Sequence, residues 1–142
     1  MQVYCGSDHG GFTLKQAILQ SNLFEIQDLG THNEQSCDYP TIAAHLCEQM
    51  QKQTSARGIL ICTTGVGMCI TANKVKGIRA ALLQDTATVI KARQHNDINV
   101  LCLPGTLSVQ TALDLIKAFL ETDFSGESRH TKRLQIIASL EK

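Results

Sequence analysis

Hydrophobic and polar positions follow two alternating patterns along this chain. Short apolar segments are separated by longer segments in which apolar residues recur every three or four positions. The first pattern is typical of buried strands, and the second of amphipathic helices. The predicted strands cover residues 3–5, 23–26, 58–62, 78–83 and 99–103. The predicted helices cover residues 12–21, 66–74, 86–93 and 107–120, and a further helix starts near Pro40.

This alternation predicts the fold class. Strands separated by helices form βαβ units, which build a parallel sheet with helices on both faces. The segment 58–62 (GILIC) is apolar without alternation, as expected of a central strand buried on both faces. We therefore expect a single α/β domain over residues 1–142, with three α/β/α layers and a five-stranded parallel sheet. An extra C-terminal helix over 129–140 can pack on its own sheet or reach a neighbouring subunit.

Composition narrows the classes of function. The 142 residues are 43% apolar and 18% charged, which is typical of a globular domain. A net charge of +0 gives no sign of a nucleic-acid-binding or basic membrane surface. Apolar runs are too short for a membrane span, and polar residues within 1–20 argue against a signal peptide. Six cysteines without C-x-x-C or zinc-finger spacing indicate free thiols in a reducing, cytoplasmic compartment.

Open parallel sheets bind ligands at the carboxyl ends of their strands, which directs attention to residues 6–11, 62–67 and 93–96. After the first strand, Asp8 and His9 precede two glycines. A carboxylate beside an imidazole can transfer protons, and a histidine at a helix N-terminus can contact a phosphate. A polar turn with an aspartate cap is the alternative interpretation.

The loop after the third strand reads Cys-Thr-Thr-Gly-Val-Gly, residues 62–67. Its glycines allow backbone N–H groups to approach an anion, and the following helix adds the positive end of its dipole. The same field favours a thiolate at Cys62, a stronger base and nucleophile. The loop lacks the third glycine of dinucleotide-binding motifs and the Gly-Lys-Ser/Thr of P-loops. A buried strand-end thiol followed by a tight turn is the alternative.

Two further polar segments carry candidate chemistry. His95, in the polar segment 93–97, is suited to acid–base work near neutral pH, or it belongs to a solvated helix end. Arg129 and Arg133 share one helix face and suit a phosphate, or they form a solvated charged face. No His/Asp/Glu group suggests metal binding, so we predict no metal. The residues assigned to packing or to the surface are His32, His45 and Cys69.

Together, these segments resemble the type B ribose-5-phosphate isomerase family, which also includes the galactose-6-phosphate isomerase subunits. The resemblance implies a Rossmann-like fold and a homodimer or dimer of dimers with active sites at the subunit interface. It also implies reversible isomerisation of ribose 5-phosphate and ribulose 5-phosphate without a metal or nucleotide cofactor. The matching stretches span nearly the whole chain: SDHGGFTLK, DLGTH, DYP, GILICTTGVGMCITANKVKGIRA, RQHNDINVL and SRHTKR.

The resemblance implies a role for each matched position. Cys62 matches the catalytic base, and His95 matches the acid that assists opening of the sugar ring. Arg129 and Arg133 match phosphate-binding arginines that meet the partner subunit's active site. The loop around the reacting carbons matches Thr63, Thr64, Gly65, Val66 and Gly67. The other positions that match sugar or phosphate contacts are Asp8, His9, Tyr39 and Asn96.

The chemistry of aldose–ketose isomerisation agrees with these roles. A proton moves between C1 and C2 through an enediolate, for which the single base Cys62 suffices. The negative oxygen needs donors, which the N–H groups of the glycine loop and the Thr64 hydroxyl can provide. Ring opening needs acid–base help, and the phosphate needs cations. The groups available are His95 and Asp8 for the first task, and Arg129, Arg133 and His9 for the second.

The chain departs from the family pattern at three places. Thr63 replaces the first glycine of the usual Cys-Gly-Thr-Gly loop, and Thr106 stands where an arginine is usual. Residues 70–72 contain no acid where some relatives use a glutamate base, so Cys62 is the sole candidate base of the loop. The two threonines leave open a six-carbon substrate, allose or galactose 6-phosphate. A non-catalytic phosphate-binding module and a redox sensor pairing Cys62 with Cys69 also remain open.

Overall fold

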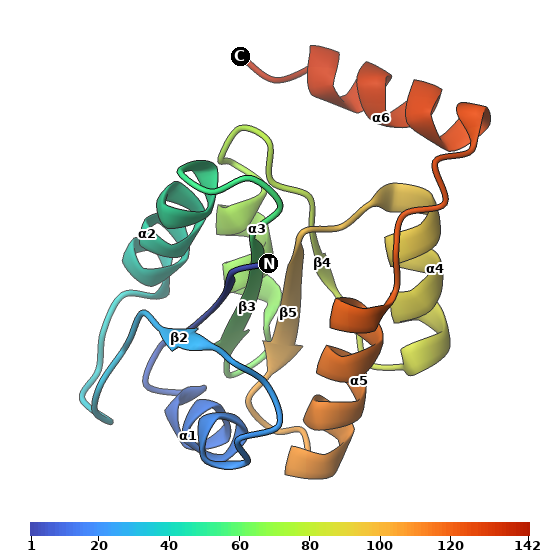
Figure 1. Ribbon diagram of the computed structural model, residues 1–142. Helices are drawn as coiled ribbons and strands as arrows, with labels where there is room; N and C mark the ends of the chain where they lie inside the picture. The colour runs from blue at the N-terminus through green and yellow to red at the C-terminus, as the bar shows by residue number, and fades with distance from the viewer.

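The computed structural model describes residues 1–142 and contains one five-stranded sheet in the order β2-β1-β3-β5-β4, with every pair parallel (Figure 1). The strands are β1 (Val3–Ser7), β2 (Gln27–Asp28), β3 (Arg57–Cys62), β4 (Ala80–Leu82) and β5 (Val100–Pro104). The helices are α1 (Phe12–Gln20), α2 (Tyr39–Gln51), α3 (Val66–Ala72), α4 (Thr86–Asn96), α5 (Val109–Glu121) and α6 (Ser128–Ser139). The predicted α/β architecture is confirmed.

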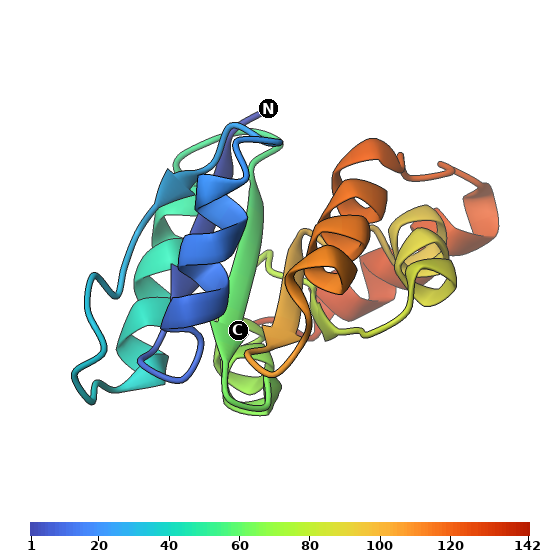
Figure 2. The same ribbon diagram turned by 90° about the horizontal axis from the view of Figure 1, so that it is seen from below.

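Two hydrophobic cores cover the two faces of the sheet. Helices α1, α4 and α5 lie on one face of the sheet, and α2 and α3 lie on the other (Figure 2). The side chains of each set form one core with the strands. Along β3, Ile59 and Ile61 enter the first core, whereas Leu60 and Cys62 enter the second. This strand therefore has no polar face, which explains its uninterrupted apolar sequence.

The predicted strand over residues 23–26 is wrong. The second strand is only Gln27–Asp28, an edge strand that pairs with β1 alone. Phe24 and Ile26 pack against the first core without joining the ladder, and Leu23 is 64% exposed. An apolar segment that covers the rim of a core has the same composition as a short strand, so the pattern alone misplaced it.

The C-terminal helix α6 stands apart from the three layers and is reached through an extended segment (Figure 1). Its apolar side chains Ile136, Ile137 and Leu140 are 55%, 47% and 75% exposed. A groove lies between α6 and the α4–β4 side of the sheet, lined in part by Leu134 and Ile137. None of the helices has both the length and the apolar character that a membrane crossing requires.

Candidate active site

The carboxyl ends of β1, β3 and β5 meet at one edge of the sheet. The Asp8 N–H donates to the Ile61 carbonyl at 3.2 Å, and the Gly105 N–H donates to the Cys62 carbonyl at 2.7 Å. These bonds bring the Asp8–Gly11 turn, the Cys62 loop and the Gly105 turn together. The first two lie at the carboxyl ends of their strands, as the sequence predicted.

The Cys62 thiol ends β3 and is 5% exposed. Its Sγ accepts a hydrogen bond from the Gly65 N–H at 3.1 Å, which fixes the sulfur beneath the loop. Gly65 has φ +78°, and a Cβ there would lie 2.5 Å from Leu82 Cδ1 and 3.0 Å from the Leu103 carbonyl carbon. Conformation and space therefore both require glycine at this position.

Close approaches of glycine backbones shape the walls of this edge. A Cβ on Gly10 would lie 2.1 Å from Thr63 Oγ1, so the Thr63 side chain packs against the β1–α1 turn. A Cβ on Gly67 would lie 2.5 Å from Tyr39 Cζ, which places the tyrosine ring over the start of α3. The unusual threonine is thus accommodated by a glycine on the neighbouring turn.

Helix N-termini at this edge fall into two kinds. The Asp85 side chain caps α4 by accepting from the Thr88 N–H, and Ser108 caps α5 by accepting from the Thr111 N–H. By contrast, α1 and α3 begin after Gly11 and Gly65, which have no capping side chain. The first N–H groups of an uncapped helix have no intrahelical partner, so an anion between these two helices finds available donors.

Asp8 and His9 differ in how they are held. Asp8 is 5% exposed, and its Oδ1 accepts from the Gly11 N–H at 3.1 Å. His9 is exposed, and its Nδ1 accepts from the Cys37 N–H at 3.3 Å. The proton of a neutral His9 ring therefore lies on Nε2, which is free to donate to a ligand.

His95 and Asn96 lie at the opposite, amino edge of the sheet. The helix α4 begins after the carboxyl end of β4 and runs back antiparallel to the strands, so its last turn precedes β5. The expectation that residues 93–96 join the carboxyl-edge site within one chain is wrong, because they lie in this last turn and not at a strand's carboxyl end. His95 is half-buried there, and Asn96 is exposed.

Comparison with known proteins gives the family. The family model described as Ribose/Galactose Isomerase matches residues 3–137. The chain belongs to this family. It is 42% identical over 145 residues to the probable ribose-5-phosphate isomerase B of Mycoplasma pneumoniae, covering 99% of this chain and 95% of that protein.

Solved structures of the family share the fold. The ribose-5-phosphate isomerase B of Clostridium thermocellum has a TM-score of 0.91 at 39% identity and covers 99% of this chain and 97% of its own. The type B enzyme of Trypanosoma brucei has a TM-score of 0.91 at 41% identity, covering 99% and 98%. The Mycoplasma genitalium enzyme, with ribulose-5-phosphate bound, has a TM-score of 0.89 at 38% identity, covering 97% and 94%. The predicted family and fold are confirmed.

Sequence reasoning missed one member of the amino-edge group of this isomerase-family chain. His130, at the start of α6, stacks on His95 with ring centroids 4.3 Å apart and an interplanar angle of 12°. Burial, His95 and Arg129 lower the pKa of His130. Its Nε2 is buried without a hydrogen-bond partner. The sequence shows that His130 is adjacent to the candidate residue Arg129. Nothing in the sequence indicates its contact with His95.

The two arginines of α6 project outward beside this histidine pair. Arg129 is exposed, and its Nε donates to Glu127 Oε2 at 3.1 Å. Arg133 is also exposed, one helical turn further on. The predicted site residues therefore divide into two groups at opposite edges of the sheet. The carboxyl-edge group is Asp8, His9, Tyr39, Cys62, Thr63, Thr64, Gly65, Val66 and Gly67, and the amino-edge group is His95, Asn96, Arg129 and Arg133.

Proposed function

We propose that this chain catalyses the reversible isomerisation of D-ribose 5-phosphate and D-ribulose 5-phosphate. The observation that carries the proposal is the Cys62 sulfur, held by the Gly65 N–H at the carboxyl end of β3 beside two uncapped helix N-termini. The family, and relatives named ribose-5-phosphate isomerase B, support the choice of reaction. The proposed reaction belongs to carbohydrate metabolism. The six free thiols fit a cytoplasmic location. We propose that residues 1–142 form the enzyme as one domain.

In the proposed reaction, Cys62 removes the proton from C2 of the open-chain aldose and returns it to C1. Both positions lie on one face of the enediolate, so a single base serves both transfers. The developing oxyanion is stabilised by the backbone N–H groups of Thr64 and Gly67, because the N–H groups of Gly65 and Val66 donate to Cys62 Sγ and Thr64 Oγ1. The Thr64 Oγ1 already accepts from the Val66 N–H at 3.3 Å, which leaves its own O–H free to donate.

The remaining groups are proposed to come from a second subunit. His95, Asn96, Arg129 and Arg133 lie at the amino edge and cannot meet Cys62 of their own chain. In a two-fold dimer, the amino edge of one protomer can face the carboxyl edge of its partner, which unites the two groups. An interface between these two edges is supported by the exposed apolar residues of α6 and by Val66 and Ile70 on α3, which are 48% and 59% exposed.

Within that dimer, each amino-edge residue has a distinct task. His95 donates or accepts the proton that opens the sugar ring, with Asp8 of the other protomer close to the sugar. Arg129 and Arg133 bind the phosphate together with His9. A homodimer, or a dimer of dimers, is therefore the smallest active assembly that we expect.

The test is a Cys62→Ala variant assayed with ribose 5-phosphate in deuterated water. We expect kcat to fall by at least about 100-fold, loss of deuterium incorporation at C1 and C2, and retained sugar-phosphate binding. Cys47→Ala is the matched control, because Cys47 is equally buried on the same face of the sheet but lies on α2. It should keep its activity.

Three results would contradict the proposal. Full activity of Cys62→Ala would exclude Cys62 as the base. Binding without deuterium exchange in the unmutated protein would indicate a non-catalytic phosphate-binding module. A higher kcat/KM for allose or galactose 6-phosphate than for ribose 5-phosphate would move the substrate to a six-carbon sugar.

A further inference from the structure

A lysine in the first turn of α1, Lys15, is completely buried, with a side-chain exposure of 0%. Its Nζ donates to Asp28 Oδ1 at 2.5 Å and to the Thr31 carbonyl at 2.7 Å. A buried ammonium group is costly unless it is paired and hydrogen-bonded, and these two bonds meet that need. Since apolar residues often replace a buried ion pair without loss of stability, stability alone gives no reason for a lysine here.

The partners of Lys15 are themselves bonded to the end of β1. Asp28 is the last residue of β2, and its Oδ1 also accepts from the Gly30 N–H at 2.9 Å. The Ser7 N–H donates to the Gly30 carbonyl at 2.7 Å, and the Thr31 N–H donates to the Ser7 carbonyl at 2.7 Å. Residues 30–31 thus continue the pairing with β1 up to the residue that precedes the Asp8–Gly11 turn.

The Lys15 side chain closes a ring of contacts around this turn. From Ser7, the chain passes through the Asp8–Gly11 turn into α1 and reaches Lys15 in the first helical turn. The Lys15 Nζ then bonds the Thr31 carbonyl, and the Thr31 N–H bonds back to Ser7. Lys15 therefore cross-links the two ends of the segment that carries Asp8 and His9.

Inside the ring, Asp8 has few restraints of its own. Its N–H donates to the Ile61 carbonyl at 3.2 Å, and its Oδ1 accepts from the Gly11 N–H at 3.1 Å. Its Oδ2 accepts no hydrogen bond from the chain and is available to a ligand. The direction of the carboxylate thus follows the backbone of the turn, which the ring of contacts holds.

We propose that Lys15 is a positioning residue that holds the Asp8 carboxylate in place through residues 28–31. Its consequence for catalysis rests on the proposed function, in which Asp8 assists opening of the sugar ring. A misplacement of about 1 Å can cost about 100-fold in rate, so loss of the Lys15 bonds should lower kcat about tenfold or more.

The first experiment measures amide hydrogen exchange on the full-length protein. Lys15→Met keeps an apolar side chain of similar length and removes both bonds. We expect the N–H groups of Ser7 and Thr31 to exchange about tenfold faster or more, because their hydrogen bonds open more often. Arg57→Met is the matched control and should leave these rates unchanged, since Arg57 also donates to backbone carbonyls but lies at the opposite edge of the sheet.

A second variant covers the case in which Lys15→Met does not fold. That change leaves the Asp28 carboxylate unpaired, whereas Lys15→Met/Asp28→Asn removes both charges and still lacks the ammonium group. Circular dichroism establishes which variant is folded. Unchanged exchange of the Ser7 and Thr31 N–H groups in the folded variant would overturn the proposal.

The second experiment is a double-mutant cycle on kcat, measured with ribose 5-phosphate below the onset of unfolding. Lys15→Met should lower kcat and change KM by less than about twofold, because the phosphate contacts remain. Lys15→Met/Asp8→Asn should have a kcat within about twofold of that of Asp8→Asn, because both changes act on one group. Losses that multiply would refute action through Asp8, and Arg57→Met should keep its kcat.

The two experiments separate this inference from the proposed function. Hydrogen exchange needs no isomerase activity, so an inactive unmutated protein would contradict the proposed function while the exchange rates of Ser7 and Thr31 still decide whether Lys15 holds the turn. Faster exchange in Lys15→Met with unchanged kcat in an active enzyme would refute its role in catalysis.

Discussion

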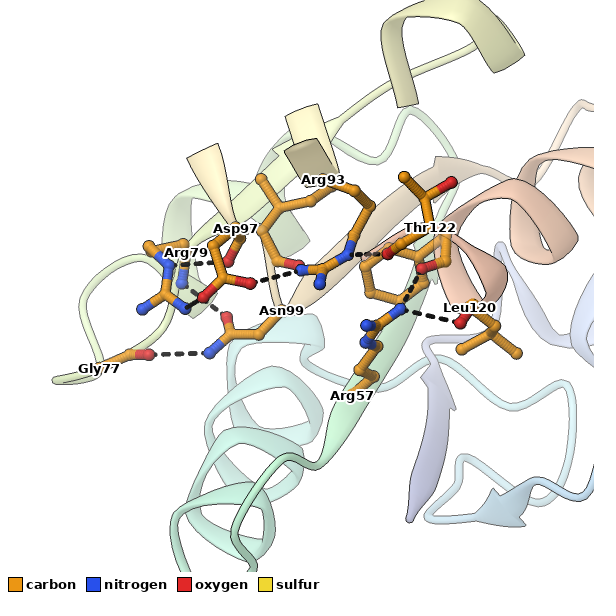
Figure 3. A network of polar contacts seen from close by, with 10 residues as sticks. Arg57, Gly77, Arg79, Arg93, Asp97, Asn99, Leu120 and Thr122 are labelled. Carbon is orange, nitrogen blue, oxygen red and sulfur yellow. Dashed lines mark hydrogen bonds and ion pairs between the residues drawn. The ribbon is translucent and has the colours of Figure 1, made fainter. Parts of the chain in front are cut away.

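The amino and carboxyl edges of the sheet differ in how their polar groups are hydrogen-bonded. At the amino edge, Arg57, Arg79 and Arg93 are bonded to carbonyl oxygens and to Asp97 in a dense network (Figure 3). At the carboxyl edge, the loops around Asp8 and Cys62 are built on glycines and leave N–H groups open. At the amino edge these polar groups are paired within the chain. At the carboxyl edge the open N–H groups gain hydrogen-bond partners only when a ligand binds.

The direction of the helices explains the difference. In a parallel α/β fold, helix C-termini collect at the amino edge and helix N-termini at the carboxyl edge. Unpaired carbonyls at the first edge need donors, which Arg57 supplies to Phe119 and Leu120, and Arg93 to Thr122. Unpaired N–H groups at the second edge need acceptors, and the sugar phosphate that we propose as the substrate would provide them.

The largest expected effect on stability comes from the amino edge. Arg93 is 4% exposed and bonds Asp97 Oδ1 at 2.8 Å as well as the Ile98 and Thr122 carbonyls. Arg93→Leu leaves these acceptors unpaired and should lower the free energy of unfolding by about 3 kcal/mol, near the lower end of the range for buried pairs because Asp97 is 31% exposed. Urea unfolding measures this.

The exposed Arg129→Leu serves as its control and should change the free energy of unfolding by less than about 0.5 kcal/mol. If both variants lost the same free energy of unfolding, Arg93 at the amino edge would be no more important for stability than the exposed Arg129 on α6.

A second comparison, between Gly65 at the carboxyl edge and Gly77 before the amino end of β4, separates the cost of backbone strain from the cost of side-chain contact. Gly65 and Gly77 have φ +78° and +80°, but a Cβ meets Leu82 and Leu103 at Gly65 and nothing within 4 Å at Gly77. Gly77→Ala should cost about 1–2 kcal/mol through conformation alone, with kcat unchanged. Gly65→Ala should cost more and lower kcat, because the N–H that holds the Cys62 sulfur moves. Chemical denaturation and steady-state kinetics on both variants decide this, and an unchanged kcat in Gly65→Ala would argue against the loop's role.

The smallest expected effect concerns a capped helix at the same edge. Hydrogen bonds from the Thr88 N–H and hydroxyl lower the pKa of Asp85 below its ordinary 3.8. The stabilisation is therefore present above about pH 4 and is lost as the pH falls through the lower, folded-state value. The Tm difference between the unmutated protein and Asp85→Ala should be constant at neutral pH and shrink in acid. A difference that grows below pH 4 would contradict the capping role.

Much of the fold follows from local patterns in the sequence. The apolar segment 58–62 predicted a strand buried on both faces, and β3 matches it closely. The segment 23–26 has a similar composition but lies beside the core as a loop, because only pairing with β1 decides where an edge strand forms. The helix predicted to end at 93 continues to Asn96, since the polar residues of its last turn do not break a helix.

The candidate site was also predicted only in part from the sequence. Asp8 and the Cys62 loop were placed correctly at the carboxyl edge, because parallel strands carry both there, and the order of β1 and β3 in the sheet makes them neighbours. His95 was assigned to that edge from its place in the chain, and the return direction of α4 puts it at the other.

By itself, the sequence determined the class of fold, the family and the chemistry of each side chain, because periodicity and residue type are local properties. Only the tertiary structure decided which of those side chains meet. It joined Cys62 to the Gly65 N–H, stacked His95 on His130, and separated these two groups across the sheet. The physical reason is that contacts between distant segments depend on strand order, helix direction and packing, which the whole chain sets together.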